Sequence, residues 1–230
     1  MQLDAVLFDK DGTLFDFAAT WNGWAGKVIG EKSGGDAALG ERIADALRYD
    51  LGRGAFLPDS PVIAGTNRDA AELVASALPG SSIEELEEFL MLSASKAGQV
   101  PAVDLPPFLQ GLKARGLSLG VMTNDTEYAA RAHLTAAGVI DRFDMVIGFD
   151  SGYGAKPEPG PLLAFADHIG HAPHRIAMVG DSTHDLIAGR AAGMICIGVL
   201  SGPAQAEELA PFADHVLPNI GHIPALLDQG

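Results

Sequence analysis

The most constraining feature of the sequence is a short apolar run near its start that ends in two aspartates. Residues 3–8 have the length of a buried strand, and Asp9, Lys10, Asp11 and a Gly-Thr turn follow. Residues two apart in an extended chain point the same way, so we expect Asp9 and Asp11 to face one small volume, with Lys10 turned away. In open α/β sheets, ligands bind beyond the carboxyl ends of the strands. The run therefore predicts a strand that carries two carboxylates into a site.

The close pair of carboxylates favours a particular chemistry. Two such groups repel each other unless a cation or a shared proton lies between them. A hard divalent cation satisfies them, and Mg²⁺ is the usual ion where phosphate is handled. Gly12 permits a tight turn whose backbone N–H groups can point at an anion. We therefore expect Asp9, Asp11 and Gly12 to form part of a site for Mg²⁺ and phosphate.

Composition excludes several classes of partner. The 230 residues carry a net charge of −15, which argues against binding to nucleic acid or to an anionic membrane, since both need basic patches. The first residues lack the charged and apolar regions of a signal peptide, and glycine and proline interrupt the longest apolar stretch. With one cysteine, Cys196, the chain has no disulfide framework. We expect a cytoplasmic protein, monomeric or homodimeric, that binds a small metabolite.

The periodicity changes from strand-like to helical over residues 16–99. Four helices are expected there, and their apolar positions are Phe17, Trp21, Trp24 and Val28; Leu39, Ile43, Leu47 and Leu51; Leu73, Val74 and Leu78; and Ile83, Leu86, Phe89 and Leu90. Asp36, Thr66 and Ser82 are the expected N-caps of the last three helices. We expect both tryptophans in the core of this helical unit rather than against a substrate.

The longest non-helical part of this segment is the stretch 52–61, and Arg53 is its only cation. If the stretch faces the rest of the chain, Arg53 is a candidate for binding a second anionic group on the substrate, bidentately if that group is a carboxylate. The alternative is an arginine that lies in solvent on a mobile loop.

Further apolar runs downstream indicate more strands, and polar residues follow three of them. The runs are 118–122, 145–149, 176–179 and 194–200, and a short edge strand is expected within 213–217. Thr123 and Asn124 follow the first run, Lys156 follows the second, and Asp181 and Asp185 follow the third. Asp185 lies one helical turn beyond Asp181, so both acids can share a face. Four acids and one lysine are expected to converge, which is costly without a bound cation.

In this order, the segments resemble the four motifs of the haloacid dehalogenase (HAD) superfamily. Residues 9–16 are similar to DxDGT[LV]xD, 123–124 to motif II, Lys156-Pro157 to motif III, and residues 180–185 to GDxxxD. The helical insert resembles the C1 cap of that superfamily. The resemblance implies a doubly wound parallel sheet, the Rossmann-like HAD core, made of residues 1–15 and 100–230, with a helical cap at 16–99.

The resemblance also implies a function, that of a Mg²⁺-dependent phosphatase similar to the phosphoglycolate phosphatase group. Its substrate would be a small phosphomonoester, phosphoglycolate-like or a sugar phosphate. By this resemblance Asp9 attacks phosphorus to form an aspartyl-phosphate, and Asp11 acts as general acid and then as general base.

The same resemblance assigns the remaining site residues. Asp9, the carbonyl oxygen of Asp11 and Asp181 would hold Mg²⁺, and Asp185 would place a metal-bound water. The groups that would stabilise charge on the transferred phosphoryl group are Thr123, Asn124 and Lys156.

Three alternatives stay open within this superfamily, and one is disfavoured. A β-phosphoglucomutase-like mutase has the same core. A phosphonatase needs a lysine in the cap, for which Lys27 and Lys32 are candidates. An inactive binding protein of this fold would have lost an acid or the lysine, and none is lost. Dehalogenases lack the second aspartate, so Asp11 argues against that reaction.

Overall fold

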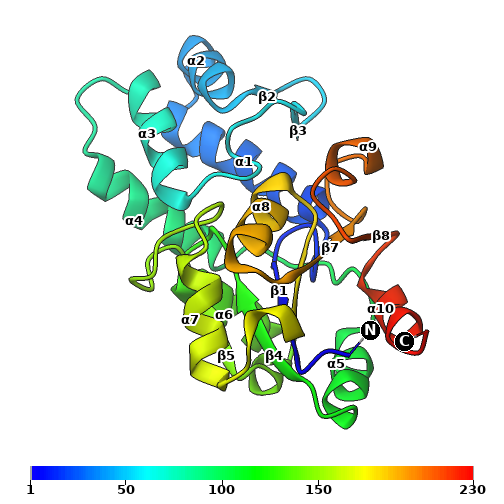
Figure 1. Ribbon diagram of the computed structural model, residues 1–230. Coiled ribbons are helices and arrows are strands. Elements are labelled where there is room, and N and C mark those ends of the chain that lie inside the picture. Colours follow the sequence, from blue (N-terminus) through cyan, green and yellow to red (C-terminus); the bar gives the residue numbers. More distant parts are fainter. Residues whose placement is uncertain (1, 230) are drawn as a thin grey trace.

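A six-stranded parallel sheet organises one lobe of the computed structural model, which describes residues 2–229 (Figure 1). In spatial order the strands are β5 (Met145–Ile147), β4 (Ser118–Met122), β1 (Ala5–Phe8), β6 (Ile176–Gly180), β7 (Ile195–Val199) and β8 (His215–Leu217). Leu7 in the central strand β1 pairs with Gly120 on one side and Met178 on the other. The strand order reverses at β1, so the carboxyl end of β1 is the switch point of a doubly wound sheet. The predicted fold class is confirmed.

Helices cover both faces of the sheet, because alternate side chains of β1 enter different cores. Val6 and Phe8 pack with α5 (Leu105–Ala114), α6 (Glu127–Ala136) and α10 (Ile223–Leu227). Ala5 and Leu7 pack on the opposite face with α7 (Gly160–Ile169) and α8 (Thr183–Ala192). A strand buried on both faces needs a continuous apolar run, as β1 has. The short helix α9 (Ala206–Leu209) packs beside Cys196, which is a buried free thiol as predicted.

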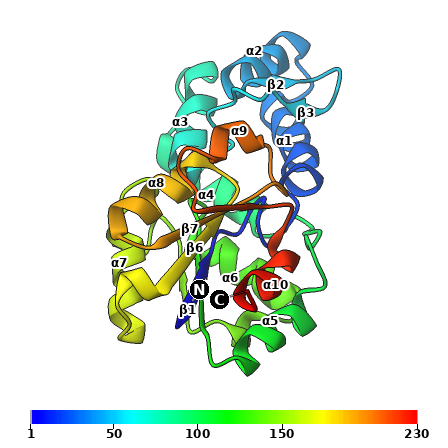
Figure 2. The same cartoon turned by 45° about the vertical axis from the view of Figure 1, so that its right-hand side comes forward.

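Residues 16–99 form a second, mainly helical lobe above the carboxyl ends of the strands (Figures 1 and 2). We call them the helical lobe and the remaining described residues the sheet lobe. The four helices are α1 (Phe17–Ser33), α2 (Ala37–Leu47), α3 (Asn67–Ala77) and α4 (Ile83–Ala94), and they share an apolar core of their own. The predicted caps at Asp36, Thr66 and Ser82 each accept a hydrogen bond from the first turn of their helix.

One part of the helical lobe differs from the prediction. Helix α2 ends at Leu47 rather than continuing to Leu51, because Arg48 takes a left-handed conformation with φ 54°. The chain then forms a two-stranded antiparallel ribbon, β2 (Tyr49–Asp50) and β3 (Ala55–Phe56), where a loop was expected. The non-helical part of this segment therefore begins at Arg48 rather than at Gly52.

Two adjacent chain segments connect the lobes. The Asp16 N–H donates to the Val100 carbonyl over 2.8 Å, and Phe15 pairs with Pro101 in an antiparallel bridge. Asp16 also caps α1 by accepting from the Ala19 N–H over 2.8 Å. The predicted division into a catalytic core and a cap stays a prediction. Among residues 2–229, no helix has the length and apolar character needed to cross a bilayer.

Candidate active site

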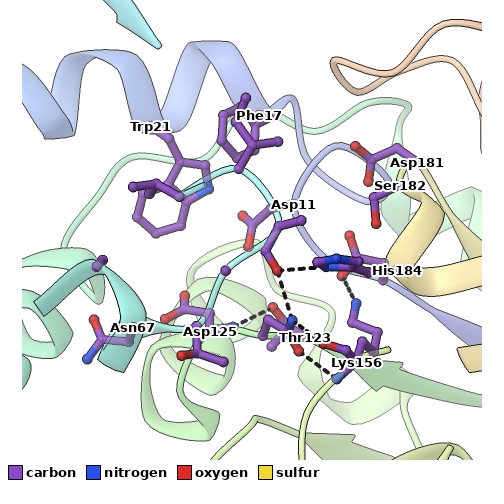
Figure 3. A pocket seen from close by; sticks show the side chains of 18 of the residues that line it. Asp11, Phe17, Trp21, Asn67, Thr123, Asp125, Lys156, Asp181, Ser182 and His184 are labelled. Atoms are coloured by element: carbon purple, nitrogen blue, oxygen red, sulfur yellow. Dashed lines mark hydrogen bonds and ion pairs between the residues drawn. The ribbon is translucent and has the colours of Figure 1, made fainter. Parts of the chain in front are cut away.

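A cavity of about 90 Å³ lies between the two lobes at the carboxyl end of β1 (Figure 3). The sheet lobe contributes polar side chains to it, namely Asp9, Asp11, Thr123, Asn124, Asp125, Lys156, Asp181, Ser182, His184 and Asp185. The helical lobe contributes Phe17, Trp21, Trp24, Phe56, Val62, Ile63, Ala64, Gly65, Thr66, Asn67, Ala70 and Ala94. One wall is therefore charged and the other is largely apolar.

Three buried aspartates gather at the charged wall. Carboxylate oxygens of Asp9, Asp181 and Asp185 lie within 4.8 Å of one another. Asp9 directly follows β1, Asp181 directly follows β6, and Asp185 lies in the first turn of α8. The approach of the Asp9 loop depends on Gly12, since a Cβ there would lie 2.2 Å from an oxygen of Asp181. The sequence prediction that strand ends bring these acids together agrees with the geometry.

The aspartates are in an environment that disfavours their charge. Burial raises the pKa of Asp9 to about 7, against the opposing charge of Lys156, while Asp185 and Asp11 add to the rise. Burial also raises the pKa of Asp181 well above its ordinary value, and the neighbouring carboxylates Asp9 and Asp185 raise it further. The described residues therefore supply too little positive charge to offset the burial of Asp9 and Asp181.

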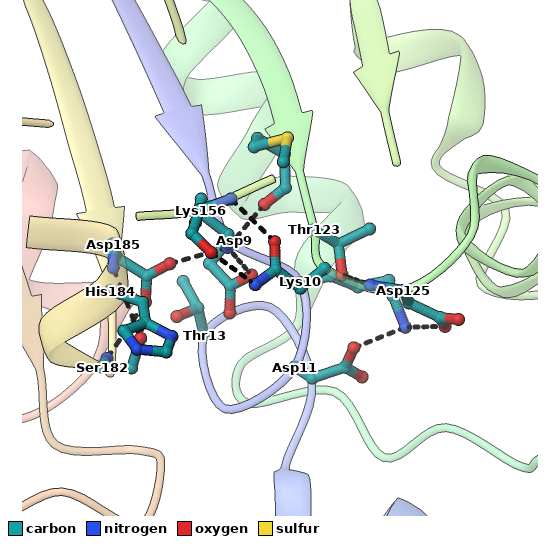
Figure 4. Close-up of polar contacts among 12 residues, drawn as sticks. Asp9, Lys10, Asp11, Thr13, Thr123, Asp125, Lys156, Ser182, His184 and Asp185 are labelled. Carbon is teal, nitrogen blue, oxygen red and sulfur yellow. Dashed lines mark hydrogen bonds and ion pairs between the residues drawn. The ribbon is translucent and has the colours of Figure 1, made fainter. Parts of the chain in front are cut away.

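Lys156 is the cation of the charged wall (Figure 4). Its ammonium group lies 2.6 Å from Asp9 Oδ1 and 2.7 Å from Asp185 Oδ1, and it donates to the Met122 carbonyl over 3.0 Å. Burial opposes its charge, but Asp185 and Asp9 raise the pKa of Lys156 overall, so it stays an ammonium ion. Three acceptors fix its position beside Asp9.

Asn124 braces this lysine rather than pointing freely into the cavity. Its side-chain oxygen accepts from the Lys156 N–H over 3.0 Å, and its amide donates to the Lys156 carbonyl over 2.9 Å. The same amide donates to the Ala64 carbonyl of the helical lobe, also over 2.9 Å. Thr123 lines the cavity next to it and accepts from the Asp125 N–H over 3.1 Å. The side chain of Asn124 thus orients the lysine loop, a role that the sequence analysis did not foresee.

Asp11 lies apart from the triad and is paired with Lys10. The sequence predicted that Lys10 turns away from the acids, and this was wrong. Its side chain is fully buried, and its ammonium group lies 2.7 Å from Asp11 Oδ2 and 3.1 Å from Asp125 Oδ2 (Figure 4). Sequence reasoning missed Lys10 and Asp125 as site residues, although Asp125 directly follows the Thr123-Asn124 pair.

The two tryptophans belong to apolar clusters, Trp24 against the core of the helical lobe as expected, but both side chains also line the cavity. Trp21 packs with Phe17, Ala94 and Ala129 where the lobes meet, and both Trp21 and Trp24 line the cavity. They are therefore placed to contact a ligand, as Figure 3 shows for Trp21 beside Phe17.

Arg53 does not line this cavity. Its side chain is 81% exposed at the tip of the β2–β3 ribbon, and its nearest carboxylate is Asp50 at 3.6 Å. The geometry gives no support to the candidate role of Arg53 in binding substrate.

The triad fits a divalent metal ion. Its members offer hard oxygen ligands, as Mg²⁺ prefers, and burial raises the pKa values of Asp9 and Asp181, so a cation beside them would favour their ionised forms. The triad contains three of the four predicted metal residues, Asp9, Asp181 and Asp185. Asp11 was expected to contribute its carbonyl oxygen, which stays a prediction, and its side chain is paired with Lys10.

Comparisons with known proteins agree with this fold. The family model of the haloacid dehalogenase-like hydrolases matches residues 3–193, so the chain belongs to that family. Within that family, the chain is a phosphatase.

Three relatives show the extent of the likeness. The phosphoglycolate phosphatase of Yersinia pseudotuberculosis is 31% identical, over 97% of this chain and 95% of its own length. That of Xylella fastidiosa is 33% identical, over 88% and 82%. The crystal structure of a HAD phosphatase from Thermococcus onnurineus, 26% identical, superposes with a TM-score of 0.67 over 98% of both chains.

Proposed function

We propose that this chain is a Mg²⁺-dependent phosphatase that hydrolyses a small phosphomonoester through an aspartyl-phosphate on Asp9. The observation that carries the proposal is the position of Asp9, which lies between the ammonium group of Lys156 at 2.6 Å and two further buried acids. A carboxylate held beside a fixed cation at the mouth of a cavity is suited to nucleophilic attack on an anionic ester.

The residues of the charged wall have different roles in the proposed phosphoryl transfer. Asp9, Asp181 and Asp185 would hold Mg²⁺, which neutralises charge on the phosphoryl oxygens and on the attacking carboxylate when it is bound. Lys156 lowers the pKa of Asp9 against the effect of burial, which favours the ionised nucleophile, and it faces the charge of the incoming phosphoryl group. Thr123 offers a hydroxyl group at the same wall. The repulsion between two anions, nucleophile and ester, is thereby reduced.

Asp11 is placed for proton transfer. Its Oδ2 is paired with Lys10, whereas its Oδ1 is buried and has no hydrogen-bond partner among residues 2–229. An oxygen that lines the cavity and makes no other hydrogen bond is available to the leaving oxygen of an ester. Asp11 would donate a proton to that oxygen and later take one from the hydrolytic water.

The apolar wall favours an uncharged leaving alcohol with an apolar face. Among the described residues that line the cavity, Lys156 is the one lysine or arginine, and Asp9 and Asp185 already pair with it. A leaving group with a carboxylate would therefore be desolvated without a cation of its own. Sugar rings and other neutral alcohols can instead pack on Trp21 and Phe56. We propose that the preferred substrate is the phosphomonoester of an uncharged alcohol, such as a sugar phosphate.

The test is phosphate release from a panel of esters with and without Mg²⁺. The panel contains 2-phosphoglycolate, a hexose 6-phosphate and p-nitrophenyl phosphate. Asp9→Asn should lower kcat by several orders of magnitude for every ester, because it removes the nucleophile. Asp141→Asn, which removes an exposed acid of the 3-10 helix η1 (Ile140–Arg142), should leave kcat unchanged.

Each outcome of the panel has a distinct meaning. Metal-dependent release that is fastest with the sugar phosphate supports both the reaction and the substrate class. A clear preference for 2-phosphoglycolate would overturn the substrate class alone. Full activity in Asp9→Asn would overturn the covalent mechanism, and a long-lived phosphorylated protein without phosphate release would indicate the mutase instead.

A further inference from the structure

The buried ammonium group of Lys10 lies at the centre of a network that joins the two lobes. Lys10 follows Asp9 directly, is fully buried and does not line the cavity. Three acceptors surround its Nζ, namely Asp11 Oδ2 at 2.7 Å, Asp125 Oδ2 at 3.1 Å and His133 Nδ1 at 3.0 Å. The contact with His133 is a hydrogen bond, and the two carboxylates pair with the ammonium group as ions.

His133 extends this network into the helical lobe. Its Nε2 lies 2.8 Å from the carbonyl oxygen of Ala94, the last residue of α4. A carbonyl oxygen only accepts, so Nε2 carries the proton and Nδ1 is left to accept from Lys10. The helical lobe thereby fixes the tautomer and the ring orientation of a side chain that belongs to α6.

Trp21 is a second contact between Lys10 and the helical lobe. The ammonium group lies 5.2 Å from the centre of the Trp21 ring, and the same ring packs edge-on against His133 with centroids 6.1 Å apart. An indole face at this distance attracts a buried cation. Both contacts of the network with the helical lobe, Ala94 and Trp21, come from residues that also line the cavity.

We infer that Lys10 is a positioning residue that holds Asp11 in its acid–base orientation, and that the helical lobe completes this arrangement through His133 and Trp21. The inference rests on the proposed function, because it takes Asp11 as the proton donor. Lys10 fixes Oδ2, while Oδ1 has no hydrogen-bond partner among residues 2–229 and belongs to a side chain that lines the cavity. Separation of the lobes would remove the Ala94 carbonyl from His133 and the ring from Lys10, so the acid is set only while the cavity is covered.

Stability alone does not account for a lysine at this position. Replacing a buried ion pair by apolar groups of similar volume is often neutral or stabilising, whereas removing one partner leaves an unpaired buried charge. The Lys10→Met variant has a similar volume but leaves two carboxylates uncompensated. We therefore pair it with a double variant, Lys10→Met with Asp125→Asn, in which one of those charges is also removed.

The experiment compares two esters that differ in their need for a proton donor. An alkyl phosphate must expel an alkoxide, which needs a general acid, whereas p-nitrophenyl phosphate expels a stable phenolate, which does not. Lys10→Met, alone and in the double variant, should lower kcat/KM about 10- to 100-fold more for the alkyl ester than for the aryl ester. The ratio kcat/KM is compared because it reports the steps up to phosphoryl transfer to Asp9, whereas the later hydrolysis of the aspartyl-phosphate is common to both esters. Asp11→Asn should likewise slow hydrolysis of the alkyl ester more than that of the aryl ester. His133→Phe should show the same difference to a smaller extent.

Lys113→Met is the matched control, because it removes a partly exposed lysine that pairs with Asp144. It should leave the hydrolysis rate of both esters unchanged. Equal losses for both esters in Lys10→Met and in the double variant would overturn the positioning role, because a general defect of folding or of the nucleophile affects every substrate alike. Failure of the wild-type protein to hydrolyse either ester would overturn the proposed function and this inference together.

Discussion

At the scale of single residues, the surroundings of His133 decide its charge. The pKa of His133 is lowered to about 4, first by burial and then by the ammonium group of Lys10. Asp11 and the Ala94 carbonyl act in the opposite direction. The native chain therefore keeps this imidazole neutral over a range in which an ordinary histidine, with a pKa near 6.5, takes up a proton.

This difference predicts a loss of stability in mild acid. Between pH 6.5 and pH 4 the unfolded chain binds a proton at His133 that the native chain does not, so the free energy of unfolding falls as the pH falls. At pH 5 this one residue should cost about 2 kcal/mol relative to neutral pH. The measurement is urea unfolding of the wild type and of His133→Gln at pH 7 and pH 5.

The Gln variant cannot take up the proton, so its stability should fall less between the two pH values. The carboxylates of the triad titrate in both proteins and cancel in the comparison. An equal fall in the free energy of unfolding from pH 7 to pH 5 in the wild type and in the variant would contradict the neutral state of His133.

Residue spacing predicts some of these site residues and not others. Asp9 and Asp181 end buried strands, and parallel strands bring their ends to one edge, so their meeting follows from the sequence. Alternation fixes only the direction of the Cα–Cβ bond, however. The long side chain of Lys10 brings its ammonium group to Asp11, which spacing cannot reveal. The exposure of Arg53 depends on a ribbon that no periodicity indicated.

At the scale of elements, local chemistry predicted the helices and strands well. Helix starts follow from side chains such as Asp36, Thr66 and Ser82, whose capping hydrogen bonds are made within three residues. The end of α2 at Leu47 was not predictable in this way, because non-glycine residues rarely take the left-handed conformation that Arg48 adopts. Tertiary packing therefore overrides the apolar periodicity that continues to Leu51.

The loop after β1 supplies a prediction at this scale. Gly12 has φ 85°, and an added Cβ would overlap the carboxyl group of Asp181, which is itself buried. Gly12→Ala should therefore displace Asp181 from the triad and abolish most Mg²⁺-dependent phosphate release.

Gly34→Ala is the control, because Gly34 also has a positive φ, 58°, but nothing lies within 4 Å of the added Cβ. It should cost about 1 kcal/mol of stability, from the left-handed backbone alone, and leave kcat intact. Thermal unfolding and phosphate release of both variants provide the measurement. If Gly12→Ala kept full activity, the close approach of the Asp9 loop to Asp181 would not matter for the reaction.

At the scale of the whole molecule, the helical lobe acts on the site through backbone carbonyls as well as through its aromatic wall. The Ala64 carbonyl accepts from Asn124 and lies 3.2 Å from His184 Nδ1, and the Ala94 carbonyl lies against His133. Carbonyl positions depend on how the two lobes pack and not on side-chain identity. For this reason the sequence could predict that a helical insert covers the site but not which groups of the sheet lobe it would hold.

The net charge of −15 and the buried triad together predict how the whole molecule responds to Mg²⁺. An ion that binds only the folded chain stabilises it, by about 2.7 kcal/mol at a hundredfold excess over Kd, and this corresponds to a rise in Tm of about 5–10 °C for a chain of this size. Asp181→Asn should lose most of this rise because it removes one ligand. Without the metal it should be more stable than the wild type, since one buried charge is gone.

Asp141→Asn, which removes one charge from the surface, separates specific binding from general screening. It should keep the full rise in Tm, because screening of a net charge acts on every exposed acid alike whereas the triad is one site. The readout is thermal unfolding followed by circular dichroism, with Mg²⁺ varied at constant ionic strength, and it needs no substrate. Equal rises in Asp181→Asn and Asp141→Asn would assign the effect to screening and would remove the triad as the metal site, even if phosphate release still required Mg²⁺.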